Sequence, residues 1–90
     1  MPVISKFNGY KITMYYKDHM PPHIHVEYNG NKSTIEINNV NNIKGDIKKK
    51  DLKVIQRWIK LRQKELIECW NLIINNEEPI YIKPYNKKED

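Results

Sequence analysis

Two Asn-Gly pairs constrain the fold of this chain more than any other feature of its sequence, at Asn8-Gly9 and at Asn29-Gly30. Each pair lies between two short segments in which apolar and polar residues alternate. Asn-Gly is a preferred loop of the two-residue β-hairpin, because both loop positions need a positive φ. The sequence therefore predicts two hairpins, with strands over 3–7 and 10–16 and over 23–28 and 32–37.

The third of these strands, 23–28, has one polar and one apolar face. Successive side chains of a strand point to opposite faces, so His23, His25 and Glu27 share one face and the apolar residues between them face the core. A two-residue loop also fixes which residues lie opposite each other. Glu36 of the following strand is therefore expected opposite His23, on the same polar face.

The second half of the chain is dominated by a helical pattern. Apolar residues recur at helical spacing over 52–74, a segment without Gly or Pro, and Asp51 precedes it as a suitable N-cap. A short edge strand is expected over 43–47. The sequence thus predicts an α+β fold, a small antiparallel β-meander of four to five strands packed against one long α-helix in the C-terminal half, with a short extended tail. The predicted organisation is a single domain over 1–85 and a polar tail over 86–90.

Length and composition restrict the class of protein. Ninety residues can form one modest hydrophobic core, and the single cysteine, Cys69, excludes an internal disulfide and suits a reducing compartment. No segment resembles a signal peptide or approaches the roughly 20 apolar residues of a membrane helix. We therefore expect a soluble cytoplasmic protein with no membrane partner and no cofactor.

The three histidines of the chain, His19, His23 and His25, lie close together in the sequence. They fit three interpretations: outward residues of a half-buried strand, acid–base chemistry near neutral pH, or ligation of zinc. The cysteine pairs that would strengthen a zinc site are absent from the sequence, so no metal is predicted. The candidate catalytic residues are His23, His25 and Glu36, and the candidate contacts to a ligand or partner are Asp18, His19, Glu27 and Arg62.

A Pro21-Pro22 pair precedes the strand that carries two of these histidines. Two consecutive prolines fix φ and lack backbone donors, so the loop is expected to be stiff and to hold His19 beside the start of the strand. Whether the Met20-Pro21 and Pro21-Pro22 bonds are cis or trans is left open by the sequence.

The net charge of +5 raises the question of a nucleic-acid partner. Arg62 projects onto the apolar side of the predicted helix, where a guanidinium must either extend to solvent, pair with a carboxylate or bind an anionic ligand. A basic stripe on the opposite side is either a solvated face or a surface that follows a phosphate backbone. Its members, the candidate nucleic-acid contacts, are Lys53, Arg57, Lys60 and Lys64.

A resemblance to a known family rests on residues 1–7, on Met14-Tyr15-Tyr16 and on the helix residues Trp58, Leu61, Glu65-Leu66 and Trp70. Its most specific part is Asp18-His19-Met20-Pro21-Pro22-His23-Ile24-His25-Val26-Glu27-Tyr28, which resembles the hallmark Asp-His-x-Pro-Pro-His-x-His-x-x-Tyr of the bacterial domain of unknown function 4160 family. The family often has a histidine within the helix where this chain has Arg62. The resemblance implies a small bacterial protein whose gene lies beside that of another small protein, in arrangements that look like toxin–antitoxin pairs.

The function predicted from this resemblance is a small cytoplasmic binding module of such a pair, which contacts a protein or nucleic-acid partner through the face around His23 and His25. The alternative is a metal-independent, ribonuclease-like toxin that uses the same two histidines as acid and base. Whether the chain is an enzyme, and its oligomeric state, are left open by the sequence.

Overall fold

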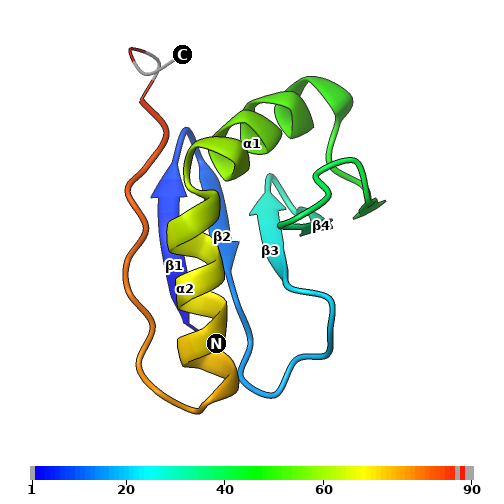
Figure 1. The fold of residues 1–90 in the computed structure, drawn as a ribbon. Coiled ribbons are helices and arrows are strands. Elements are labelled where there is room, and N and C mark those ends of the chain that lie inside the picture. Colours follow the sequence, from blue (N-terminus) through cyan, green and yellow to red (C-terminus); the bar gives the residue numbers. More distant parts are fainter. Residues whose placement is uncertain (1, 87, 89–90) are drawn as a thin grey trace.

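The computed structural model describes residues 2–86 and 88, and it has an α+β architecture (Figure 1). One antiparallel sheet contains five strands in sequence order, β1 (Val3–Phe7), β2 (Tyr10–Thr13), β3 (His23–Tyr28), β4 (Asn31–Glu36) and β5 (Ile43–Gly45). Two helices follow, α1 (Lys49–Leu61) and α2 (Gln63–Ile74). The predicted α+β meander is confirmed, and the single long helix is wrong.

Both predicted hairpins are present and have the expected backbone geometry. The loop residues Asn8 and Gly9 have φ of 51° and 84°, and Asn29 and Gly30 have φ of 49° and 81°. In the second hairpin His23 pairs with Glu36, as the two-residue loop predicted. The strand ends differ slightly from prediction, because β2 ends at residue 13 and β4 begins at residue 31.

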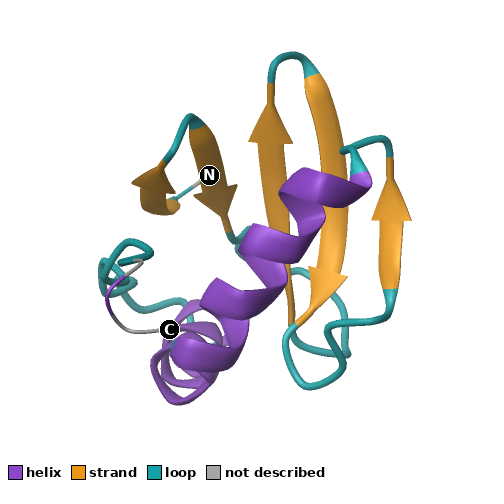
Figure 2. Ribbon diagram, turned by 90° about the horizontal axis from the view of Figure 1, so that it is seen from above, coloured by secondary structure: helices purple, strands orange, loops and turns teal. Residues whose placement is uncertain are grey.

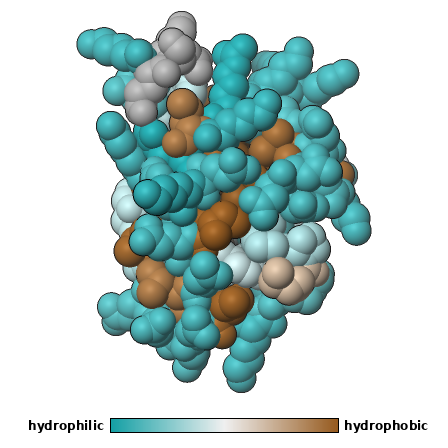
Figure 3. Space-filling view, viewed as in Figure 1, coloured by the Kyte–Doolittle hydropathy of each residue, from teal (hydrophilic) through white to brown (hydrophobic). Residues whose placement is uncertain are grey.

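A single apolar core joins the sheet to both helices. The sheet contributes Ile24 and Val26, which alternate with the histidines as predicted. Figure 1 shows α2 in front of β1 and β2, and Figure 2 shows the other helix crossing in front of the middle of the sheet. Figure 3 shows a mostly hydrophilic surface on the side seen in Figure 1. The helices contribute to this core a set of fully buried side chains: Ile55, Trp58, Ile59, Leu66, Cys69, Trp70 and Ile73.

The predicted helix over 52–74 is divided at Arg62, which has φ −111° and ψ 16°. Its side chain supplies the physical reason, because Nε donates to the carbonyl oxygen of Lys83 at 3.0 Å and a terminal nitrogen donates to that of Pro84 at 3.0 Å. These bonds join the break to the C-terminal segment, the described residues 75–86 that follow α2. On the two sides of the break, α1 and α2 run in different directions (Figure 1). No Gly or Pro marks the break, so nothing in the local sequence predicted it.

The start of α1 also differs from prediction. The helix begins at Lys49, so Asp51 lies inside its first turn and is not the N-cap. Asp51 is buried, and its carboxylate accepts a hydrogen bond of 2.7 Å from the hydroxyl of Tyr10 on β2. The residue that seemed suited to begin the helix instead joins the helix to the sheet.

The C-terminal segment is extended and follows the outer edge of β1. The backbone N–H of Ile82 donates to the carbonyl oxygen of Ile4 at 2.7 Å, and the N–H of Lys6 donates to the hydroxyl of Tyr81 at 3.0 Å. The segment is not assigned as a strand. Residues 87, 89 and 90 of the predicted polar tail lie outside the described residues. Within the described chain, neither helix has the length and hydrophobicity needed to span a membrane.

Candidate functional site

The polar face of the sheet is the side on which the predicted site residues meet. Strand pairing arranges its side chains in short rows across the sheet, and one row contains Thr13, His25, Thr34 and Lys44 on four successive strands. The neighbouring rows are Lys11, Glu27 and Lys32, and His23 with Glu36. Acidic, basic and imidazole groups therefore alternate over the face of the sheet opposite the apolar residues of β3, Ile24 and Val26.

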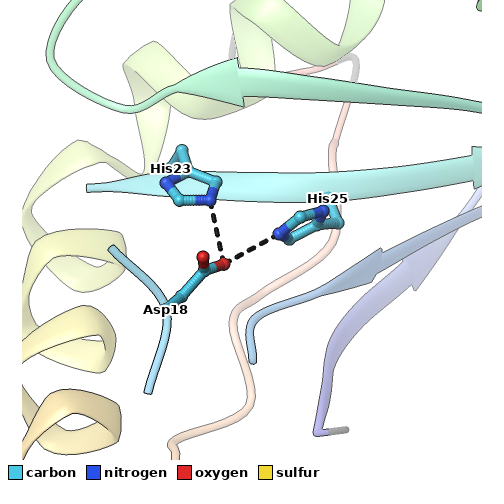
Figure 4. A group of neighbouring side chains, drawn as sticks. All are labelled: Asp18, His23 and His25. Carbon is cyan, nitrogen blue, oxygen red and sulfur yellow. Dashed lines mark hydrogen bonds and ion pairs between the residues drawn. The ribbon is translucent and has the colours of Figure 1, made fainter. Parts of the chain in front are cut away.

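The centre of the site is a carboxylate that joins two imidazoles. Oδ2 of Asp18 lies 2.9 Å from Nε2 of His23 and 2.9 Å from Nε2 of His25 (Figure 4). Asp18 comes from the loop between β2 and β3, while both histidines come from β3. The loop thus folds back over the start of the strand that follows it. We call Asp18, His23 and His25 the Asp-His-His cluster.

The loop is shaped so that Asp18 meets the strand. Lys17 has φ 63°, and the Met20-Pro21 bond is cis, which answers the question that the sequence left open. The other carboxylate oxygen of Asp18 accepts the backbone N–H of His19 at 2.9 Å. Nδ1 of His23 donates to the carbonyl oxygen of Pro21 at 2.7 Å. The carboxylate of Asp18 is therefore oriented by the next residue of the loop, and the C-terminal end of the loop is fixed to His23.

Burial and charge act in opposite directions on Asp18. Its partial burial favours the neutral acid, but the hydrogen bond from His25, the backbone N–H of His19 and the charges of both cluster histidines favour the carboxylate. The net effect holds the pKa of Asp18 below its ordinary value. The cluster therefore contains a stable negative charge between two imidazoles.

The imidazoles are also held by ring contacts. The ring of Tyr15 packs edge-on against His25 with centroids 4.3 Å apart, and the ring of Trp70 on α2 lies 5.3 Å from that of His23. Only 7% of the His23 side chain is exposed, against 29% for His25. His23 is thus a buried member of the site, and His25 is the member accessible from the polar face.

Two adjoining hollows open on this face. One of about 290 Å³ lies beside the cluster, and its lining is His19, Pro21, His23, His25, Thr34, Glu36, Asn42 and Lys44. The second, of about 240 Å³, shares His25, Thr34 and Lys44 with the first and continues toward Lys11 and Glu27. Small ions and side chains of a partner can therefore approach the cluster from this side.

The other predicted site residues of the sheet and its loops lie near the cluster but are not members of it. Glu36 lies beside the cluster, but its Oε1 accepts a hydrogen bond of 3.0 Å from Asn42. Glu27 lies one row away, and its Oε2 is 4.0 Å from Nζ of Lys32. His19 is 86% exposed, and its Nδ1 lies 3.2 Å from Oδ1 of Asp18. The structure thus places these residues around the cluster, at its rim.

The predicted residues on the helices lie apart from this face. Arg62 is buried, and its contacts include hydrogen bonds to the backbone carbonyls of Lys83 and Pro84. The exposed basic stripe is divided by the break, with Lys64 on α2. The other members, Lys53, Arg57 and Lys60, line a hollow of about 180 Å³ on α1.

Three contributors to the site were missed by sequence reasoning. Tyr15 was assigned to a strand, and its position against His25 depends on the end of β2 at residue 13. Lys44 joins the row of His25 through the pairing of β4 with β5, which no short loop specifies. Trp70 is a core residue, and its contact with the ring of His23 depends on how α2 meets the sheet. Of these three, only Tyr15 could have been linked to the site from the sequence, because it lies three positions before Asp18.

This geometry defines a class of protein: an α+β sheet protein with a histidine–carboxylate cluster at the start of one strand. Residues 9–71 match the family described as Domain of unknown function (DUF4160), and the chain belongs to that family. The match includes the whole Asp-His-His cluster and ends within α2. Comparison with curated proteins and with solved structures gave no match.

Proposed function

We propose that this chain is a small cytoplasmic binding module, one member of a toxin–antitoxin-like protein pair, and that it contacts its partner through the polar face of the sheet. The observation that carries the proposal is the pair of adjoining hollows around His25, on the face opposite the helices. The gene arrangement implied by the family resemblance supports a small protein as the partner.

The charges of this face favour a protein over a nucleic acid as that partner. Three lysines, Lys11, Lys32 and Lys44, are interleaved with Glu27 and Glu36, and the carboxylate of Asp18 lies beside them. A surface that follows a phosphate backbone needs an excess of positive charge. Interleaved charges of both signs instead give specificity for a partner with the complementary pattern.

The fixed cluster also suits a binding surface. Both histidines and Asp18 are held by hydrogen bonds before any partner arrives, so little side-chain freedom is lost on binding. Two consecutive prolines in the adjoining loop restrict its backbone, so the surface at the start of β3 is preorganised for one shape of partner.

The alternative, a metal-independent ribonuclease, receives less support from the same geometry. An acid–base pair needs each imidazole free to exchange a proton with the substrate. Here both Nε2 atoms contact one carboxylate oxygen, and Glu36 is engaged by Asn42. The carboxylate of Asp18 occupies the space between the imidazoles, where a phosphate would otherwise bind.

The binding proposal is tested with the product of the neighbouring gene. The two proteins are purified separately, and the dissociation constant is measured by titration calorimetry for the wild type and for Lys44→Glu. The matched control is Lys53→Glu, the same charge change at an exposed position of α1. We expect Lys44→Glu to weaken binding at least ten-fold and Lys53→Glu to leave it unchanged.

Equal binding by all three proteins would remove the polar face from the interface. Weakening by Lys53→Glu alone would move the interface to the helices. The ribonuclease alternative is tested separately, by incubating RNA with the pure protein across the pH range in which histidine titrates. Cleavage by the wild type that is lost in His25→Ala would replace the binding proposal with the enzymatic one.

A further inference from the structure

We propose that the Asp-His-His cluster is a binding site for one divalent transition-metal ion, with Zn²⁺ as the reference ion. The proposal goes beyond the binding function and does not rest on it, because it concerns the chain alone. Two imidazole nitrogens and a carboxylate oxygen are a common set of three protein ligands for zinc.

The first argument is the convergence of the ligand atoms. One ligand atom from each of Asp18, His23 and His25 lies within 4.8 Å of the other two, and within the described part of the chain this is the single group of three or more such residues. Zinc bonds of about 2.0–2.2 Å in tetrahedral geometry place neighbouring ligand atoms roughly 3.3 Å apart. The two Nε2–Oδ2 distances of 2.9 Å would lengthen by a few tenths of an ångström, and the two Nε2 atoms, which lie within 4.8 Å of each other, would move to a similar spacing.

The second argument comes from the hydrogen bonds of His23. Its Nδ1 faces the carbonyl oxygen of Pro21, which only accepts, and its Nε2 faces the carboxylate of Asp18. With a metal on Nε2, the neutral ring keeps its Nδ1–H bond to Pro21, the arrangement that orients histidine ligands in metal sites.

The third argument is access. The hollow of about 290 Å³ reaches the cluster from the polar face, so positions not filled by protein remain open to water or to a further ligand. His19 stands at the rim, with Nδ1 3.2 Å from Oδ1 of Asp18. Imidazole ligands favour zinc and its neighbours among the transition metals over Mg²⁺ and Ca²⁺, which prefer oxygen ligands.

The sequence predicted no metal because it lacks cysteine pairs. In the site proposed here the third ligand, beside the two histidines, is the carboxylate of Asp18 and not a cysteine. Cys69 is buried and its thiol donates to the carbonyl oxygen of Ile80, so it does not take part. Asp18 is separated from His23 by a loop with two prolines, and the fold of that loop brings its carboxylate to the strand.

Equilibrium dialysis of the metal-stripped full chain against Zn²⁺, followed by elemental analysis, tests the proposal. We expect one zinc per chain for the wild type and for Glu27→Gln, a control on the same strand and face. Asp18→Asn and His25→Ala are expected to weaken binding by more than about 100-fold, since even changes beyond the direct ligands cost 10–100-fold. Circular dichroism checks that each variant is folded, and His25 is suited to this because its side chain is partly exposed.

Cobalt provides a second measurement that does not depend on the variants. Co²⁺ bound by two imidazoles and a carboxylate in tetrahedral geometry is expected to give a strong visible absorption band, which Zn²⁺ removes and excess Mg²⁺ does not. Absence of this band, or equal zinc content in the wild type and the folded His25→Ala, would overturn the proposal. Neither experiment involves a partner, so a failure here is distinguishable from a failure of the binding function.

Discussion

Tyr10 and Asp51 form a buried link between β2 and α1 whose strength depends on pH. Burial, the hydrogen bond to Asp51 and the negative charge of Asp51 raise the pKa of Tyr10 above its ordinary value. In the unfolded chain a tyrosine ionises near pH 10. The contribution of Tyr10 to the free energy of unfolding is therefore complete below about pH 10 and is lost as the pH rises further.

We predict that Tyr10→Phe lowers the free energy of unfolding at neutral pH by about 1–3 kcal/mol, because the carboxylate of Asp51 loses its donor. Above pH 10 the free energy of unfolding of the variant should fall less steeply with pH than that of the wild type. Urea unfolding at several pH values measures both effects. Tyr81→Phe, at an exposed position, is the control. Identical slopes in Tyr10→Phe and the wild type would contradict the prediction.

Gly45 is required at its position by both backbone and space. Its φ is 123°, and a Cβ there would collide with the carbonyl oxygen of Lys32. We predict that Gly45→Ala destabilises the chain by about 3 kcal/mol or more. Gly30→Ala, at φ 81° with open space around it, should cost only about 1–2 kcal/mol. Thermal unfolding of both variants measures the difference, and equal costs would show that the collision is relieved by movement of β5.

At the scale of residues, the sequence predicted the histidine face but not the group that completes it. Alternation along β3 and the Asn29-Gly30 loop were sufficient to place His23 opposite Glu36. Strand periodicity does not extend into a loop, so the contact of Asp18 with both histidines depends on the path of residues 14–22. The prediction therefore grouped Asp18 with the two histidines as candidates without assigning the contacts between them.

At the scale of elements, Arg62 connects the helical layer to the C-terminal segment. We predict that Arg62→Met lowers the free energy of unfolding by about 1–3 kcal/mol, since it removes the donors to Lys83 and Pro84. Lys60→Met, at an exposed position nearby, should change it by less than about 0.5 kcal/mol. Chemical denaturation compares the two. Faster chymotrypsin cleavage at Tyr81 in Arg62→Met would identify the C-terminal segment as the part released.

The strands were easier to predict than the helices for a physical reason. Hairpin loops and alternation are local signals, and they placed four strands with small errors at the ends. The break at Arg62 is imposed by a contact with residues about twenty positions later, and the intact helical periodicity on both sides gave no sign of it. The position of the helix break thus depends on tertiary contacts, whereas the positions of the hairpins depend on local sequence.

At the scale of the whole molecule, the binding proposal predicts how a bacterial host responds to the chain. We expect induction of the wild type and of the double variant His23→Ala/His25→Ala to give the same growth. A binding module without nuclease activity has no catalytic activity toward the RNA of the host that the loss of the histidines could remove. Growth curves after induction, at matched protein levels on a blot, provide the measurement. Arrest by the wild type alone would contradict this expectation and favour a toxin that acts through the cluster.

The C-terminal segment gives the sheet two unequal edges. Its bonds to Ile4 and Lys6 occupy outward backbone groups of β1, while β5 has no strand beyond it in the described chain. A strand from another molecule can therefore be added at β5 but not at β1. Two copies that met edge to edge would use up both free edges at once. Self-association through the sheet would thus stop at a dimer and could not propagate into a fibre.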